Sequence, residues 1–265
     1  GQFGACKEDA DGNKFADETK RAEAWKRYER YWTQICDRFK DYSDHLIFEG
    51  ANEELGDRLN DAIYESGYCV PKDDNDTKAI SGNLTEDERY EMANKINQKF
   101  VDIVRSTGGN NAYRHLLIAG YDTNIDKTCD DKFKMPTDTA ENGTTKLSVS
   151  VHYYTPWDFC GDGGSGIYTQ KDKEATETYF TKMDKFYNAG YGIIMGEFSV
   201  CNPKQEGVAQ WLNDTMTIAA KHHILPVLWE TNQYMDKDNC KMRYNDIAVL
   251  YNTITGSTGD TSSKI

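Results

Sequence analysis

The sequence predicts an α/β fold with a parallel sheet covered by helices, and two observations carry this prediction. Short apolar runs alternate along the chain with longer segments whose apolar residues recur at helical spacing. The apolar runs are continuous, which is typical of strands that are buried on both faces of a parallel sheet. We expect five strands, over residues 45–51, 113–121, 146–154, 190–200 and 223–231.

Helices are expected before, between and after these strands. The first covers 18–40, where aromatic and other apolar residues recur at helical spacing with charged residues between them. The second begins after a capping box formed by Thr85 and Glu88 and ends at Gly108-Gly109. The remaining helices are expected over 171–188, 204–221 and 243–254.

The expected elements belong to one domain. The chain of 265 residues is long enough for a single large domain, and no stretch of it reads as an interdomain linker. We place the domain at 1–256 and expect the Ser- and Thr-rich segment 257–265 to be a flexible tail. Long loops follow the strands, where α/β folds and barrels in particular place their sites; they cover 54–83, 122–145 and 155–170.

The composition excludes several classes of function. A net charge of −13 would repel the phosphates of a nucleic acid. No apolar stretch approaches the roughly 20 residues that cross a bilayer. The 7 cysteines include no CxxC pair, so a zinc site is not expected. Neutral sugars, peptides and small metabolites remain as candidate ligands.

Four of the five expected strands end in chemically capable side chains. These endings are Asn52-Glu53, His152-Tyr153-Tyr154, Gly196-Glu197-Phe198 and Trp229-Glu230. A single carboxylate after a strand is more often solvated than catalytic. Because the carboxyl ends of parallel strands meet at one edge of the sheet, the four endings together favour a functional site.

Two carboxylates on different strands suit glycoside hydrolysis. At a separation of about 5–5.5 Å, one can attack the anomeric carbon while the other protonates the leaving oxygen. A tryptophan at a strand end offers a flat apolar face to a sugar ring, and asparagine and histidine can bind hydroxyl groups. Trp157, in a long loop, is a further candidate for a sugar subsite.

Four segments of the sequence, "IFEGANEE", "VHYYTPWDFCG", "IMGEFSV" and "VLWETNQ", resemble the motifs of glycoside hydrolase family 5. This is the cellulase family of a retaining clan built on (β/α)8 barrels, and the closest resemblance is to its endoglucanase and xyloglucanase branch, subfamily 4. The resemblance implies that Glu53 is the acid/base and Glu197 the nucleophile. It also implies substrate-binding roles for Asn52, His152, Tyr154 and Trp229.

Each candidate also has a structural interpretation. Glu53 could be a solvated carboxylate at a strand end, and Glu197 a member of a structural ion pair. Asn52 could cap the turn that follows it. The histidine and tyrosine after the third strand could pack at the rim of the barrel, and the tryptophans could belong to the core.

Other aromatic and histidine residues are expected to be structural. Trp25, Trp32 and Trp211 lie on predicted helices and are interpreted as core residues. His115 precedes an apolar strand and is interpreted as a structural histidine. Glu230 is too close to the proposed site to dismiss, and we assign it no role.

The sequence departs from the family pattern in two ways. Glu54 stands where the family usually has a proline after Asn-Glu. The expected strand at 45–51 corresponds to the family's fourth, so the first three strands, with a supporting Arg and His, are expected to be absent. The expected fold is therefore an incomplete TIM-type (β/α) barrel, with about five parallel strands that correspond to strands 4–8.

An incomplete barrel would expose sheet edges and apolar surface, which favour association. We therefore expect a homo-oligomer that covers the open side of the barrel. A partner fragment that supplies the missing strands is one alternative. The N-terminal segment folded over the opening is another.

The resemblance implies a retaining glycoside hydrolase that cleaves β-1,4-linked glucans, needs no metal or organic cofactor and is secreted to the extracellular space. A carbohydrate-binding remnant without catalysis is the alternative, because the absent Arg and His would leave the nucleophile poorly held. The chain could also be a fragment of a longer active enzyme.

Overall fold

The computed structural model describes residues 6–8, 10–11, 14–16, 18–60, 63–64, 67–68, 80–81, 84–138, 140, 146–230 and 232–255. The chain folds into two compact units, Gly1–Val149 (unit 1) and Ser150–Ile265 (unit 2). The predicted tail, 257–265, lies outside the described residues. The placement of one catalytic domain over 1–256 stays a prediction.

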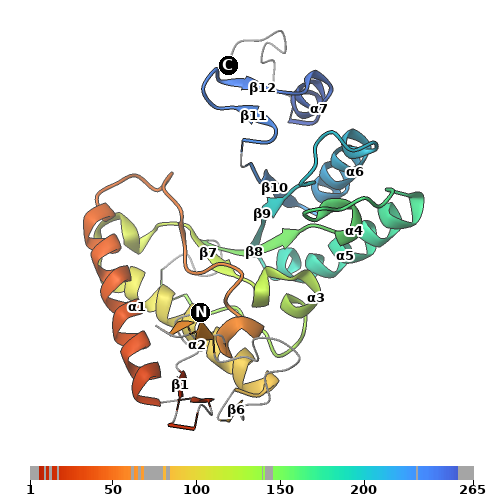
Figure 1. The fold of residues 1–265 in the computed structure, drawn as a ribbon. Helices are drawn as coiled ribbons and strands as arrows, with labels where there is room; N and C mark the ends of the chain where they lie inside the picture. Colours follow the sequence, from red (N-terminus) through yellow and green to blue (C-terminus); the bar gives the residue numbers. More distant parts are fainter. Residues whose placement is uncertain are drawn as a thin grey trace. The chain divides into compact units, whose positions relative to one another are not determined.

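The main sheet contains five parallel strands in the order β10-β9-β8-β7-β3. These are β3 (Phe48–Glu49), β7 (Leu116–Ala119), β8 (Leu147–Tyr153), β9 (Gly192–Phe198) and β10 (Ile224–Leu228), the last four of which are labelled in Figure 1. In unit 1, β3 pairs with β7 so that Phe48 lies opposite Leu116. In unit 2, β9 pairs with β10 so that Ile193 lies opposite Ile224. The predicted α/β class and its five parallel strands are confirmed.

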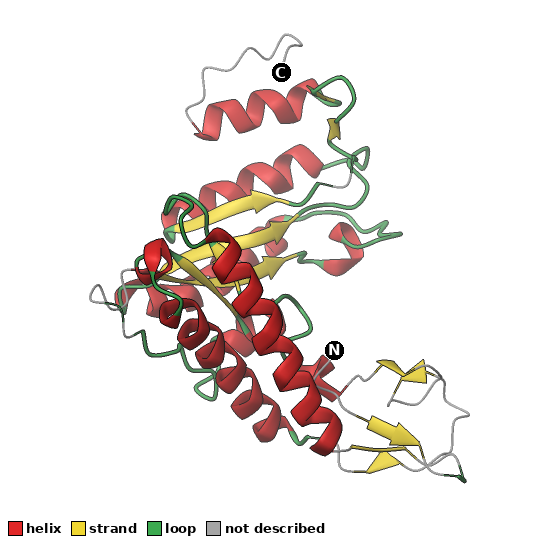
Figure 2. Cartoon of the chain, turned by 90° about the vertical axis from the view of Figure 1, so that its left-hand side faces the viewer, coloured by secondary structure: helices red, strands yellow, loops and turns green. Residues whose placement is uncertain are grey.

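Two long helices pack against each other in unit 1, α1 (Glu18–Phe39) and α2 (Glu86–Ser106) (Figure 2). The capping box predicted at the start of α2 is confirmed. The Thr85 hydroxyl accepts a hydrogen bond from the Glu88 amide, and the Glu88 carboxylate accepts one from the Thr85 amide at 2.7 Å. This exchange satisfies backbone donors that the first turn of a helix otherwise leaves unpaired.

β3 begins three residues later than the predicted strand over 45–51, because a buried arginine binds the preceding backbone. The Arg114 guanidinium donates hydrogen bonds to the carbonyl oxygens of Ser43 at 2.8 Å and Leu46 at 2.6 Å. It also donates to two carbonyls at and just beyond the end of α1, each at 2.9 Å. These carbonyls turn toward Arg114 rather than toward a neighbouring strand, so strand pairing begins only after them.

Unit 2 contains three longer helices, which lie close to the predicted ranges. They are α5 (Gln170–Asn188), α6 (Val208–Lys221) and α7 (Asn245–Thr255). α5 packs against α6 and β9, and α6 packs against α7 and β10.

Of the three tryptophans predicted to be core residues, Trp211 is confirmed, whereas Trp25 and Trp32 are only partly buried. In unit 2, Trp211 of α6 is fully buried, with its ring centroid 6.2 Å from that of Tyr153 and 5.9 Å from that of Phe198. In unit 1, Trp32 of α1 is partly buried and packs edge-on against Phe100, with ring centroids 4.6 Å apart.

Short elements that the sequence analysis did not predict complete the two units. They are too short to show a period in the sequence. The short strands are β1 (Cys6–Glu8), β2 (Lys14–Ala16), β4 (Ile63–Tyr64), β5 (Gly67–Tyr68), β6 (Ile80–Ser81), β11 (Met235–Asp236) and β12 (Lys241–Met242). The short helices are η2 (Asp57–Asn60), η3 (Gly109–Ala112), η4 (Tyr121–Thr123), α3 (Ile125–Thr128) and α4 (Trp157–Cys160).

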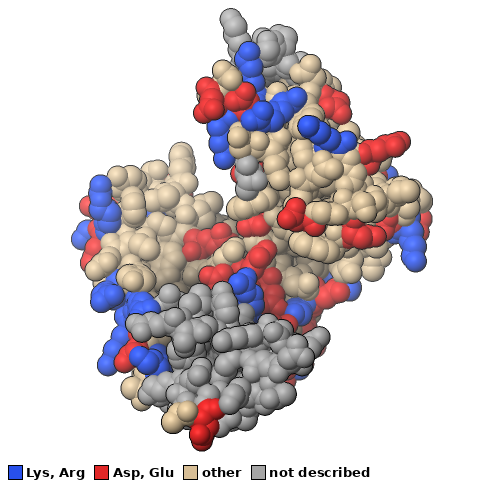
Figure 3. Space-filling model, viewed as in Figure 1, with Lys and Arg blue, Asp and Glu red and all other residues tan. Residues whose placement is uncertain are grey.

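The surface is charged, and among the described residues no helix has the length and apolar character of a membrane span. On the face drawn in Figure 3, lysines and arginines lie interspersed with aspartates and glutamates. Acidic residues outnumber basic ones in the whole chain, 44 to 31.

Candidate active site

Unit 2 holds the proposed nucleophile, Glu197 of β9, together with two side chains from the end of β8. The Tyr154 hydroxyl donates a 2.8 Å hydrogen bond to Glu197 Oε2. His152 Nδ1 lies 3.5 Å from the same oxygen. The His152 and Glu197 side chains are only 6% and 16% exposed, so the interactions of this carboxylate are weakly screened by water. The structure thus brings together three of the predicted site residues.

A glycine before the carboxylate makes room for this arrangement. Ser150 and His152 are two residues apart and therefore point to the same face of β8. A Cβ atom on Gly196 would lie 3.1 Å from Ser150 Oγ and 3.7 Å from His152 Nε2. A larger residue at this position would crowd the serine and the imidazole ring that faces Glu197.

Tyr153, which lies between the two site residues of β8, has a structural role. Its hydroxyl forms a 2.8 Å hydrogen bond with Thr176 Oγ1 of α5, and burial raises the pKa of Tyr153. The adjacent tyrosines of the sequence therefore separate into one that holds a helix and one that binds Glu197.

Trp157 and Trp229 follow β8 and β10, and both are exposed, at 66% and 42%. The Trp229 amide donates to the carbonyl of Phe198 at 3.0 Å, which ties the end of β10 to the residue after Glu197. The Trp157 ring makes an edge contact with Tyr154, with centroids 6.4 Å apart. Both tryptophans are thus attached to segments that carry site residues, and neither is a buried core aromatic.

Glu230 has a structural role that no sequence pattern revealed. Its Oε2 accepts hydrogen bonds from the backbone amides of Tyr234 and Met235, at 2.8 and 2.9 Å. Its Oε1 is buried, with no hydrogen-bond partner among the described residues. The carboxylate therefore fixes the turn that leads into β11.

Unit 1 holds the proposed acid/base, Glu53, in a turn that follows β3. The Leu55 amide donates to the Asn52 carbonyl at 3.2 Å, which closes the turn. Asn52 is exposed and Glu53 is half-buried. The turn starts directly from the sheet, because the Gly50 amide still donates to the carbonyl of Leu117 on β7 at 3.3 Å.

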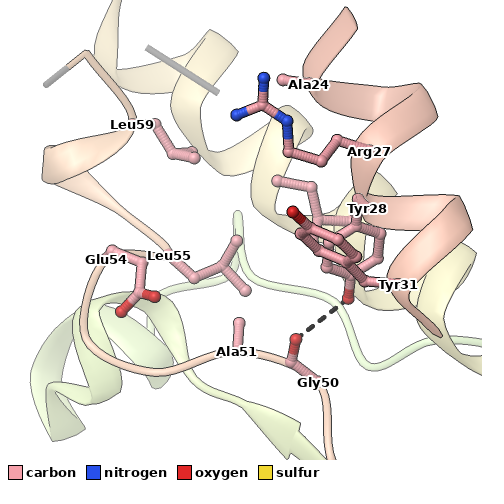
Figure 4. Close-up of a pocket in the computed structure, with 10 residues that line it drawn as sticks. Ala24, Arg27, Tyr28, Tyr31, Gly50, Ala51, Glu54, Leu55 and Leu59 are labelled. Carbon is pink, nitrogen blue, oxygen red and sulfur yellow. Dashed lines mark hydrogen bonds between the residues drawn. The ribbon is translucent and has the colours of Figure 1, made fainter. Parts of the chain in front are cut away.

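A pocket of about 270 Å³ lies beside this turn in unit 1, between α1, α2 and the segment 50–59 (Figure 4). The Tyr28 hydroxyl donates to the Gly50 carbonyl at 3.0 Å on one side of the pocket, and burial raises the pKa of Tyr28. Arg27 and Glu54 add charged groups to a lining that is otherwise largely apolar. Glu54, which stands where the family usually has proline, therefore faces a cavity next to the proposed acid/base.

His115 lies in unit 1, and its structural interpretation agrees with its surroundings. Its Nε2 lies 2.6 Å from the Ser148 hydroxyl, and burial lowers the pKa of His115.

Asn52 and Glu53 belong to unit 1, whereas Glu197 belongs to unit 2. The separation of the two proposed catalytic carboxylates stays a prediction.

Barrel-type α/β folds place their sites at the carboxyl ends of parallel strands, and a carboxylate at such a position can serve as the nucleophile of a glycoside hydrolase. The α/β sheet and the cluster in unit 2 are therefore consistent with the class of glycoside hydrolases.

The comparisons with known proteins identify the family within this class. The family model "Cellulase (glycosyl hydrolase family 5)" matches residues 7–235, and the chain belongs to this family. The chain is 32% identical over 231 residues to Endoglucanase A of Paenibacillus barcinonensis, and the match covers 77% of this chain and 52% of that protein. It is 29% identical over 238 residues to a xyloglucan-specific endo-beta-1,4-glucanase of Bacteroides ovatus, and this match covers 80% of the chain and 42% of that protein. The chain spans about half the length, or less, of these relatives.

Solved structures support the same fold. A GH5-4 broad specificity endoglucanase from Ruminococcus champanellensis with bound cellotriose superposes with a TM-score of 0.69 at 27% identity, over 88% of this chain and 64% of that chain. A Bacteroides ovatus GH5 xyloglucanase in complex with a XXXG heptasaccharide gives a TM-score of 0.68 at 26% identity, over 86% of this chain and 50% of that chain. An incomplete barrel is consistent with these matches.

Proposed function

We propose that this protein is a retaining glycoside hydrolase that cleaves β-1,4-linked glucans, with Glu197 as nucleophile and Glu53 as acid/base. The observation that carries the proposal is the cluster in unit 2, where Tyr154 donates a hydrogen bond to Oε2 of Glu197 and His152 lies close to the same oxygen. The relatives add the substrate class, because their names describe endoglucanases and a xyloglucan-specific enzyme.

The proposed reaction has two steps. In the first, Glu197 attacks the anomeric carbon while protonated Glu53 gives its proton to the leaving oxygen, so that the glycosidic bond breaks and a glycosyl ester on Glu197 forms. In the second, the Glu53 carboxylate takes a proton from water, which attacks the same carbon and releases Glu197. Two inversions leave the product in the β configuration.

The surrounding side chains supply binding and orientation. The hydrogen bond from Tyr154 fixes the carboxylate plane of Glu197, which favours attack from its other oxygen. Asn52 and His152 offer polar groups to sugar hydroxyls, and the exposed rings of Trp157 and Trp229 offer flat apolar faces to sugar rings. No metal or organic cofactor takes part in either step.

A mechanism-based label tests the proposal directly. We expect a 2,4-dinitrophenyl 2-deoxy-2-fluoro-β-cellobioside to add one fluoroglycosyl mass to the protein, and peptide mapping to place it on Glu197. Glu197→Gln should take no label, whereas Glu206→Gln, an exposed carboxylate of the same unit, should label like the native chain. Release of reducing sugar from a panel of β-glucans, xyloglucan and mannan then defines the substrate. Binding of glucan with neither label nor hydrolysis would instead support a carbohydrate-binding remnant.

We also propose that the protein is secreted and forms a homo-oligomer. Polymeric glucans do not enter cells, so an enzyme that cleaves them works outside.

Among the described residues, β3 pairs on one side only, with β7, and stands at the end of the sheet order. An open strand edge favours pairing with another chain. Light scattering after size-exclusion chromatography that shows a monomer at all concentrations would contradict the oligomer.

A further inference from the structure

A cluster of charged side chains lies behind the turn that carries Glu53, entirely within unit 1. Its central member is Asp122, just after β7. The Asp122 amide donates to the Leu55 carbonyl at 2.9 Å. The Asp122 carboxylate, through Oδ1, accepts from the Asp57 amide at 2.7 Å. One residue thus binds the backbone on both sides of Gly56.

The backbone at this contact adopts a conformation that few residues tolerate. Asp122 has φ 52° and ψ 15°, and Thr123 has φ 50°. Left-handed conformations of this kind are unfavourable for residues other than glycine, asparagine and aspartate, and persist where the surrounding structure requires them. On the opposite side, a Cβ atom on Gly56 would lie 2.0 Å from Asp122 Oδ1, so the close approach requires glycine there.

Charged groups around Asp122 hold it in this position. Lys127 Nζ donates to Asp122 Oδ2 at 2.7 Å and to Asp57 Oδ2 at 2.5 Å, and so bridges the two carboxylates. The Tyr121 hydroxyl donates to Asp57 Oδ1 at 3.0 Å, and Arg89 Nε donates to the Tyr121 oxygen at 3.1 Å. Burial lowers the pKa of Lys127, but its hydrogen bonds to both carboxylates outweigh this effect and raise the pKa above its ordinary value.

The segment from Asn52 to Asp57 is therefore fixed at three points. The Asn52 carbonyl accepts from the Leu55 amide within the turn, and Asp122 binds Leu55 and Asp57. Glu53 lies inside the first of these loops. We propose that Asp122 is a positioning residue, which holds the turn so that the Glu53 carboxyl can act as acid and then as base. This inference rests on the proposed function.

The chemistry of the two steps separates a positioning role from a general structural role. Protonation by Glu53 matters for a sugar leaving group, but matters little for 2,4-dinitrophenolate, which leaves without a proton. In the second step, azide can attack the anomeric carbon without losing a proton. The ester bond to Glu197 then breaks, and the product is a β-glycosyl azide. A variant that displaces Glu53 should therefore show both a leaving-group effect and rescue by azide.

The test uses two substitutions of Asp122 in the full chain. Asp122→Asn keeps an oxygen that can accept from the Asp57 amide and tolerates the left-handed backbone, so we expect activity on soluble β-glucan within about threefold of native. Asp122→Gly keeps the backbone conformation but removes the acceptor. We expect it to lose about 100-fold on β-glucan, because a small displacement of a catalytic group has an effect of this size.

Dinitrophenyl cellobioside and azide give the deciding readout. In Asp122→Gly, the rate of the first step on this substrate should stay within about threefold of the native rate. Added azide should raise turnover and yield the β-glycosyl azide. Asp138→Asn, which disrupts a buried ion pair elsewhere in unit 1, serves as a control for lost stability. We expect it to lower the melting temperature without azide rescue.

Two outcomes would overturn the inference. One is a loss in Asp122→Gly that is equal on both substrates and insensitive to azide; the other is native activity of Asp122→Gly on β-glucan. The fluoroglycoside label separates these failures from failure of the proposed function. If the native protein takes no label on Glu197, the proposed function is overturned. If the native protein and Asp122→Gly both take the label, the proposed function stands, and either of the two outcomes above counts against the inference alone.

Discussion

Tyr154 donates its phenolic hydrogen to Oε2 of Glu197 across 2.8 Å, and this is the same oxygen that His152 Nδ1 approaches to 3.5 Å. Two side chains from the end of β8, Tyr154 and His152, thus lie close to Oε2 of Glu197. In the proposed reaction this leaves Oε1 as the atom that attacks the sugar. The strands bring these side chains together, because both partners come from the end of β8 and the carboxylate from β9 of the same unit.

Removal of the tyrosine hydroxyl should therefore impair the first step. We expect Tyr154→Phe to lower the rate constant for formation of the glycosyl ester by about 10- to 100-fold. The substitution frees the carboxylate to rotate and removes a hydrogen-bond donor to its negative charge. Burst kinetics with an activated aryl cellobioside would measure this step separately from the second one.

The adjacent tyrosine provides a matched control. Tyr153→Phe removes the same atom, but its hydroxyl bonds Thr176 of α5 rather than Glu197. We expect it to reduce the free energy of unfolding by about 1 kcal/mol and to leave kcat unchanged. Equal effects of the two substitutions on kcat would show that the Tyr154 hydrogen bond has no special part in the reaction.

Close packing behind β3 leads to a second prediction. A Cβ atom on Gly50 would lie 2.8 Å from the Phe100 ring, within the contact distance of carbon atoms. We expect Gly50→Ala to destabilise the protein by about 1–3 kcal/mol in chemical denaturation, because the buried ring has little room to move.

A second substitution tests the cause. Phe100→Leu should be destabilising alone, yet in combination with Gly50→Ala it should recover part of the lost stability, since the smaller side chain relieves the contact. Strict additivity of the two changes would mean that the steric contact is not the reason for the effect.

The strands and strand ends could be predicted from sequence because they depend on local pattern. Continuous apolar runs located all five strands, and the residues at their ends included Glu197 and Tyr154, which the structure brings together. The alternation of residues alone does not separate Tyr153 from Tyr154, because a strand's starting face is set by packing. The resemblance to the family motif singled out Tyr154.

Long-range contacts account for what the sequence did not reveal. Arg114 shortens β3 by binding carbonyls that lie about 70 positions earlier, with sequence separations of 71 and 68 for Ser43 and Leu46. Asp122 binds the Asp57 amide across 65 positions. Neither contact has a local signature, since an Asp or Arg in a loop is ordinarily solvated.

The buried ion pair between Arg105 and Asp138 gives a pH-dependent prediction. Arg105 Nε and Nη2 donate to the two oxygens of Asp138 at 2.9 and 2.8 Å, and the side chains are 6% and 1% exposed. Burial alone would raise the pKa of Asp138, but the hydrogen bonds from Arg105 and from the Ala140 amide lower it below its usual value of 3.8. The pair therefore stabilises the fold above about pH 4, and its contribution is lost as the pH falls through the lower folded-state pKa.

Asp138→Asn should remove this contribution. At pH 7 we expect a loss of about 3 kcal/mol in the free energy of unfolding, because Arg105 is left buried without its counter-charge. The difference from the native chain should narrow as the pH falls below about 4. Asp131→Asn, at an exposed position, is the control and should change little at any pH. A difference that stays constant from pH 7 to pH 3 would refute the electrostatic explanation.

Trp157 offers a test of substrate binding that does not involve the reacting carboxylates. Its ring is 66% exposed, and a Cβ atom on Gly161 would lie 2.5 Å from the ring atom Cε2, so the glycine leaves the room that the indole occupies. If the indole face binds a sugar ring, Trp157→Ala should weaken binding by about 1 kcal/mol, or roughly fivefold in the dissociation constant. Isothermal titration of cello-oligosaccharides of increasing length to the Glu197→Gln variant would measure this. Tyr187→Ala removes an aromatic ring from α5 that is 47% exposed, and it should leave the affinity unchanged. If both variants bind every oligosaccharide like their parent, Trp157 does not form a subsite.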